Sequence, residues 1–339
     1  MKKLLTLNLL LLLLMSCSHK RVFADWDFNK EKPAHTSSIT GTPVKLGDLG
    51  IVDCFFIHCK DSLALLRTNT KKQFVVVNIT TGDTVGTYLY EGNGPNEMID
   101  PRVSGFIDEM PILFSLGDRK TYKWDLATAV NDNETRLIEF CEVPPSTFAI
   151  LKGEADTSMI AIHYGENSFD YSILNASGEI KSNGTIYEDI DLKTDITYLS
   201  YTGTVVDDKL VCAMQFFPQI NFISLKDKTK KAIVTAQSRV RWNNIFGKIA
   251  FLITMYYNDI EQCGDYIVAM YVGQTSQEYY ENPKSVHLHV FDKDGNFISD
   301  VATTESLRDL EYNAKNGILY GLGFANDLYS YPLNELTRQ

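Results

Sequence analysis

The sequence has few basic residues, few cysteines and no long hydrophobic run after its first 16 residues. Only 32 Lys and Arg stand against 43 Asp and Glu, a net charge of −11. Nucleic-acid binding needs a basic face that displaces counterions from phosphates, so this charge balance argues against it. Six cysteines in 339 residues, none in CxxC spacing, exclude a small disulfide scaffold and the common zinc motifs. An apolar content of 44% instead indicates a folded globular chain.

Two catalytic signatures are also missing. The chain has no G-x-S-x-G elbow for a serine hydrolase and no Gly-Lys-Ser/Thr loop for phosphate. Enzyme classes that depend on these motifs are therefore not expected.

Residues 1–16 resemble a bacterial export signal. Lys2 and Lys3 precede an apolar run that ends at Met15, and Ser16-Cys17 follow as in a lipobox. The run is too short for a helix that spans a hydrocarbon core of about 30 Å. We therefore predict a lipoprotein with acylated Cys17, against the alternative of an ordinary signal peptide with an incidental cysteine.

Cleavage before Cys17 removes two lysines, so the mature chain carries 30 basic and 43 acidic side chains and a net charge of −13. Ser18, where an Asp would signal retention in the inner membrane, points to the outer membrane but leaves the leaflet open. The polar residues 17–37 are expected to form a flexible tether, followed by one folded domain at 38–339.

Five cysteines remain after Cys17, at positions 54, 59, 141, 212 and 263. An odd number cannot all pair. Cys54 and Cys59 lie five residues apart on one expected strand and should face opposite sides, so a bridge between them is unfavourable. We predict buried free thiols.

After Cys17 the chain looks all-β, with one strand–turn–strand pattern repeated along it. A strand ends in Asn or Asp, and a Gly a few residues later reverses the chain, as in 74–85, 171–180 and 286–298. The markers Asn78, Asp125, Asn175, Lys226 and Asp292 are separated by 47, 50, 51 and 66 residues, and Pro332 follows 40 residues later.

Six units of this length predict a six-bladed β-propeller with four-stranded antiparallel blades. The last unit shows only three strands, near Leu310, at 318–320 and at 328–331. The segment 38–46 is expected to supply the fourth and close the ring. A pair of β-sandwiches or a right-handed β-helix is the alternative, although a β-helix would have a shorter period.

The link after the first unit reads Gly92-Asn93-Gly94-Pro95-Asn96-Glu97-Met98. It resembles the G-x-G-P-G-E-F signature of the TolB-like six-bladed propeller lipoproteins of Bacteroidetes. That resemblance implies a binding or scaffolding module of the cell envelope without catalytic residues. Asn96 departs from the signature, but Asn tolerates the left-handed turn, and Met98 keeps an apolar plug. A phosphate cradle is the rival reading of these glycines.

Propeller geometry places this link on the same face as the loops 67–72, 117–121, 164–169, 215–220 and 271–285. The loop at 271–285 contains an insertion, and long loops are often functional. Tyrosine rings suit sugar or peptide recognition. The expected ligand-binding residues of this rim are Arg102, Arg119, Tyr164, Phe216, Tyr271, Tyr279 and Tyr280.

Few residues suggest a metal or an acid–base pair. His287 and His289 face one side of a strand, but no Asp, Glu or Cys at matching spacing completes a site, so we predict no metal there. The acidic residues Glu188, Asp189, Asp191, Asp207 and Asp208 look like turns. Sequence alone does not show whether carboxylates converge.

The sequence thus predicts an outer-membrane lipoprotein, a monomer without cofactor, that binds an envelope protein or glycan on its loop-rich face. It would contact the membrane only through its lipid. The alternative is a calcium-dependent propeller hydrolase, lactonase-like or glycan-processing, with the metal in the central channel.

Overall fold

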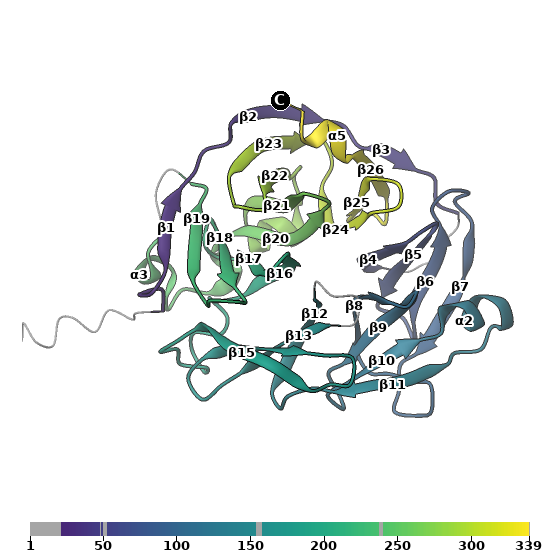
Figure 1. The fold of residues 1–339 in the computed structure, drawn as a ribbon. Helices are drawn as coiled ribbons and strands as arrows, with labels where there is room; N and C mark the ends of the chain where they lie inside the picture. The colour runs from purple at the N-terminus through teal and green to yellow at the C-terminus, as the bar shows by residue number, and fades with distance from the viewer. Residues whose placement is uncertain (1–21, 48, 50–52, 154–157, 237–239, 339) are drawn as a thin grey trace, which may run out of the picture.

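The computed structural model describes residues 22–338 except 48, 50–52, 154–157 and 237–239. The expected signal peptide and Cys17 lie outside these residues. Six antiparallel sheets stand around a central axis like the blades of a propeller (Figure 1). The prediction of a six-bladed propeller is confirmed. None of the helices in the described residues is long and apolar enough to span a membrane.

The blades follow one another along the chain, and each begins with its innermost strand. The first three comprise β4 (Cys54–Lys60), β5 (Leu63–Thr68), β6 (Lys72–Asn78) and β7 (Thr84–Tyr90); β8 (Pro101–Ile107), β9 (Met110–Ser115), β10 (Lys120–Trp124) and β11 (Leu137–Glu142); and β12 (Thr147–Lys152), β13 (Met159–Tyr164), β14 (Phe169–Leu174) and β15 (Ile180–Tyr187). The fourth and fifth comprise β16 (Tyr201–Val206), β17 (Lys209–Met214), β18 (Gln219–Ser224) and β19 (Lys230–Val234); and β20 (Thr254–Cys263), β21 (Tyr266–Thr275), β22 (His287–Asp292) and β23 (Phe297–Thr303). Within the described residues, the short helices α2 (Leu126–Asp132), α3 (Trp242–Ile245), α4 (Ser276–Glu281) and α5 (Leu333–Leu336), and the 3-10 helix η1 (Ala250–Leu252), lie in the connections and near the C-terminus.

The sixth blade is closed by the N-terminal part of the chain, as predicted. It contains β24 (Leu307–Asn313), β25 (Ile318–Gly323), β26 (Leu328–Pro332) and the N-terminal strand β3 (Thr42–Val44). Strand β3 pairs antiparallel with β26, with Val44 opposite Leu328. Joining the two ends of the chain in one blade ties the ring shut.

The prediction of a flexible tether at 17–37 is wrong for its described part. Strand β1 (Asp27–Lys30) pairs in parallel with β19, and β2 (His35–Ile39) pairs in parallel with β23. Blades four and five therefore have five strands, and the N-terminal segment runs along their outer edges (Figure 1). Short polar strands escaped the sequence reading because they use the backbone hydrogen bonds of an open sheet edge and little apolar surface.

Apolar clusters lie between neighbouring blades. The middle strands read as continuous apolar runs because the neighbouring blades cover both of their faces, as in Gln73–Val77 of β6, all of which are buried. The five described cysteines are buried and free, as predicted. Cys54 and Cys59 nevertheless share one cluster, because a β-bulge between residues 54 and 56 restores them to the same face.

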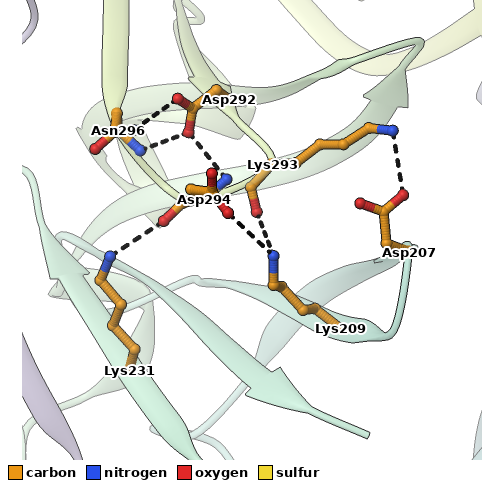
Figure 2. A network of polar contacts seen from close by, with 7 residues as sticks. All are labelled: Asp207, Lys209, Lys231, Asp292, Lys293, Asp294 and Asn296. Atoms are coloured by element: carbon orange, nitrogen blue, oxygen red, sulfur yellow. Dashed lines mark hydrogen bonds and ion pairs between the residues drawn. The ribbon is translucent and has the colours of Figure 1, made fainter. Parts of the chain in front are cut away.

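The recurrent turn is stabilised by hydrogen bonds among its own residues, as expected, and it also contacts the neighbouring blade. Asp292 Oδ1 accepts from the Asp294 and Asn296 N–H groups, at 2.9 and 2.8 Å, and Gly295 has φ 84°. The side chains of Lys209 and Lys231 in blade four then donate to this turn, and Lys293 pairs with Asp207 at 3.1 Å (Figure 2). In blade two, Asp125 caps helix α2 instead of starting a turn.

Candidate functional site

The loops expected on one face of the ring do lie there. In each blade, the link to the next blade and the loop between the second and third strands are at the same end of the strands. We call this end the loop-rich face.

The blade-link motif forms the predicted tight turn. Asn96 is left-handed, with φ 61°, and its Oδ1 accepts from the Leu137 N–H at 3.2 Å. The Gly94 N–H donates to Glu97 Oε2 at 2.9 Å, while a Cβ on Gly92 would lie only 2.0 Å from that oxygen. Met98 is buried as the expected apolar plug. All of these contacts shape the link itself, so the motif has a structural role.

The structure divides the predicted rim residues into exposed and buried ones. Arg102 and Tyr280 are exposed, and Arg102 pairs with Asp100 at 3.7 Å. Arg119 is exposed and donates to the Thr147 carbonyl, which ties the second blade to the third. The half-buried Tyr164 and Tyr271 stack on Phe148 and His289, with ring centroids at 4.4 and 4.6 Å.

The prediction that Phe216 and Tyr279 bind a ligand on the rim is wrong, because only 4% and 0% of their surfaces are exposed. The insertion at 271–285 contains helix α4, which begins with a capping box between Thr275 and Glu278. Helical spacing turns neighbouring residues to different sides. Tyr279 therefore points inward and donates to the Leu307 carbonyl at 2.7 Å, while Tyr280 is 51% exposed.

An exposed apolar surface lies beside α4 and was missed by the sequence reading. Five side chains form it, each 45 to 68% exposed, and we call them the apolar rim patch: Phe246, Ile249, Phe251, Leu252 and Tyr280. Four of them come from the link between blades four and five. A hydrogen bond of 3.2 Å from the Ser276 N–H to the Ile253 carbonyl joins that link to the start of α4.

Other apolar residues of this link pack into the core, so the segment that bears the patch is held in place. Trp242 stacks on Phe217, with ring centroids at 6.1 Å, and both Ile245 and Ile253 are buried. The Tyr198 hydroxyl donates to the Lys248 carbonyl at 2.7 Å. The apolar run 249–253 is a signal in the sequence, but the sequence analysis placed the insertion of this unit only at 271–285.

The central channel encloses a cavity of about 970 Å³ lined by the innermost strands. Its walls differ in chemistry. Strands β20, β24 and β4 contribute Asp259, Glu261, Asp309, Glu311 and His58, whereas β12 and β16 contribute mainly small or apolar residues such as Gly203 and Leu151. The sequence analysis did not single out these acids. They come together only because β20, β24 and β4, which belong to three blades, meet at the channel.

The channel carboxylates hold neighbouring blades together. Asp259 of blade five accepts from the Leu310 N–H of blade six at 2.6 Å, and Asp309 of blade six accepts from the Ile57 N–H of blade one at 2.7 Å. Burial, followed by the charge of Asp259, raises the pKa of Asp309 well above its usual value. Burial likewise raises the pKa of Asp259, and a hydrogen bond joins the two carboxyl groups.

These acids do not fit a calcium ion. Calcium needs several ionised oxygens that converge. Within the described residues, no three channel acids bring ligand atoms together, and the oxygens of Asp259 already accept backbone N–H groups. Burial and the neighbouring acids Glu311 and Asp259 raise the pKa of Glu261 well above its usual value, which favours its neutral form.

The expectation that no acid completes a site with His287 and His289 is wrong. Asp300 lies on the neighbouring strand directly opposite His289, so the three side chains form one cluster. Sequence spacing along one strand could not show this, because the pairing of β22 with β23 brings residues together across a turn. The other acidic residues behave as predicted where a turn is resolved, with Asp189 and Asp207 at φ 53° and 51°.

Comparisons with known proteins identify the fold. No family profile matches the chain, and no curated protein matches it. A Bacteroides fragilis protein described as exported is 14% identical over 91% of this chain and 82% of its own, with a TM-score of 0.50. Regucalcin, a calcium-binding protein from Agrobacterium tumefaciens, is 10% identical over 88% of this chain and 95% of its own, with a TM-score of 0.52. At these identities the likeness concerns the propeller fold alone.

Proposed function

We propose that this protein is a non-catalytic binding propeller of the cell envelope, of the TolB-like kind, that holds a protein partner on its apolar rim patch. The patch itself carries the proposal. Large apolar side chains grouped on one side of a soluble domain usually mark an interaction site. Ile249 and Leu252 at its centre suit the apolar side chains of a protein better than a sugar, which stacks on aromatic faces.

The anchor belongs to the same proposal. Acylation at Cys17 would hold the propeller at the outer membrane, because several acyl chains on one residue give stable attachment. Val22 is already buried against the fold, so only residues 18–21 separate the anchor from the packed body. The five Cα–Cα steps from Cys17 to Val22, at about 3.5 Å for each extended residue, reach at most about 18 Å. The propeller would therefore sit close to the membrane surface.

Site-specific photo-crosslinking in cells tests the partner. A photoreactive phenylalanine at position 252 should give a discrete adduct with one protein. The same residue at position 180, an equally exposed isoleucine on the outer strand of blade three, is the matched control and should not give that adduct. Identical adducts from both positions, or a glycan adduct at 252, would contradict the proposal.

The anchor is tested separately. Cys17→Ser should move the protein from the membrane fraction to the soluble fraction, while Cys141→Ser should not. A protein that stays in the membrane fraction without Cys17 would contradict a lipid anchor but would leave the rim proposal standing.

A calcium-dependent hydrolase is the second candidate, which the likeness to regucalcin suggests, although the described channel acids do not converge as calcium ligands. It requires the channel acids to bind an ion in their charged form, although their pKa values are raised by burial. Calcium titration of the chelator-treated protein distinguishes the two functions. A saturable calorimetric signal that Glu311→Gln abolishes would favour the hydrolase over the binding module.

A further inference from the structure

Three side chains that ligate metals in other proteins converge on blade five. His287 and His289 lie on β22, and Asp300 lies on β23 directly opposite His289. His287 Nδ1 is 2.7 Å from Asp300 Oδ1, and His289 Nε2 is 3.7 Å from the same oxygen. One ligand atom from each residue lies within 4.8 Å of the other two.

A chain of hydrogen bonds holds the ring of His289 in place. The Thr235 hydroxyl lies 3.2 Å from the Pro218 carbonyl and 2.7 Å from the Tyr257 hydroxyl. The Tyr257 hydroxyl is in turn 3.0 Å from His289 Nδ1. This chain engages Nδ1 and leaves Nε2 as the nitrogen that faces Asp300.

His289 Nε2 lies 3.7 Å from Asp300 Oδ1, too far for a hydrogen bond, and His289 is only 4% exposed. A buried imidazole nitrogen and a carboxylate oxygen that face each other in this way are a pair of ligand atoms for a metal ion.

We propose that His287, His289 and Asp300 bind one divalent transition-metal ion, with Zn²⁺ the first candidate. Two imidazoles and one carboxylate are a common zinc ligand set, and imidazole disfavours calcium and magnesium. Tyr257 supplies the outer hydrogen bond that orients a ligating histidine. The side chain of His287 is 44% exposed, so it can adjust to a Zn–N distance of about 2.0 Å and leave one position for water.

Blade three contains a natural control. His163 lies opposite Asp170 across β13 and β14, as His289 lies opposite Asp300. Ala161 occupies the position equivalent to His287, and His163 Nε2 already contacts the Ser172 hydroxyl at 2.9 Å. This pair lacks the second imidazole, and its Nε2 already has a hydrogen-bond partner, so it should not bind zinc.

Zinc titration of the purified mature chain after chelator treatment tests the proposal. The unmodified protein should bind one equivalent of ZnCl₂ by calorimetry. His287→Ala and Asp300→Asn should each weaken binding by more than about 100-fold, beyond the effect of removing a supporting partner. His163→Gln should bind like the unmodified protein. Absence of saturable binding, or unchanged affinity in the first two variants, would overturn the proposal.

A second measurement does not depend on variants. Nitrogen–proton correlation spectra of the chelator-treated protein should show His289 as the Nδ1–H tautomer, and Zn²⁺ should shift its Nε2 signal. An Nε2–H tautomer, or an Nε2 signal unmoved by zinc, would overturn the proposal. Circular dichroism of each variant verifies that lost binding does not reflect lost folding.

Discussion

The acids of the channel wall and the acid of the blade-five cluster lie in the same kind of sheet but have different partners. Asp309 accepts a backbone N–H from the next blade and shares a proton with Asp259. Asp300 instead faces two imidazole rings, with Oδ1 2.7 Å from His287 Nδ1 and 3.7 Å from His289 Nε2. A carboxyl group satisfied by backbone amides supports the fold, whereas a carboxylate that faces two imidazole rings can bind an ion.

The largest expected effect comes from removing the channel carboxyl. Asp309→Ala should lower the free energy of unfolding by about 3 kcal/mol, because it leaves the buried Ile57 N–H without an acceptor and removes the side chain that hydrogen-bonds to Asp259. Urea denaturation followed by tryptophan fluorescence measures it. Asp309→Asn keeps a donor and an acceptor and should lose less than half as much. Equal losses in both variants would contradict the role of the shared proton.

The outer partner of the histidine should matter next. Tyr257→Phe removes the hydrogen bond to His289 Nδ1, so the imidazole ring is no longer held in its orientation. Zn²⁺ binding should therefore weaken by roughly 10- to 100-fold. Calorimetry measures the affinity. Tyr256→Phe, on the neighbouring residue, is the control and should leave it unchanged. An affinity that survives Tyr257→Phe would mean that the hydrogen-bond chain does not prepare the site.

Without metal, the blade-five acid should contribute little to stability. Asp300→Asn should change the free energy of unfolding by less than about 1 kcal/mol, because the Asp300 side chain is 26% exposed and its His287 partner 44%. The same urea denaturation, in chelator, measures it. A loss as large as that of Asp309→Ala would remove the distinction between the two regions.

The pH dependence of stability should follow the channel acids. A carboxyl whose pKa is raised in the folded state stabilises the fold fully below its unfolded pKa of about 3.9, and this contribution is lost as pH rises through the folded value. The unmodified protein should therefore lose stability from this group as pH increases above about 4. Asp309→Asn should flatten that slope in thermal denaturation across pH. An unchanged slope would contradict the raised pKa of Asp309.

Much of the architecture was predictable because it rests on local chemistry. The turn with Asn or Asp followed by Gly needs only neighbouring residues, and it marks blades one, three and five where predicted. The closing strand near 38–46 was predictable because the last blade lacked one strand. The edge strands β1 and β2 were not, since their pairing depends on sheet edges formed by residues about 200 or more positions away.

The candidate sites were less predictable than the fold. Tyr279 and Tyr280 look equivalent in the sequence, but the helix α4 turns one into the core and the other toward solvent. Predicting a loop does not tell which of the two side chains faces the core. That depends on where helix α4 begins, and the Thr275 cap sets this start.

By itself, the sequence determined the repeat, the turns, the buried thiols and the apolar character of each strand, since these depend on residue type and short-range spacing. Only the tertiary structure decided which side chains meet. Asp300 reaches the histidines through strand pairing, Asp309 reaches Ile57 through the closure of the ring, and the rim patch forms where a link packs beside a helix. Such contacts join residues on different strands or connections, and no pattern along a single segment records them.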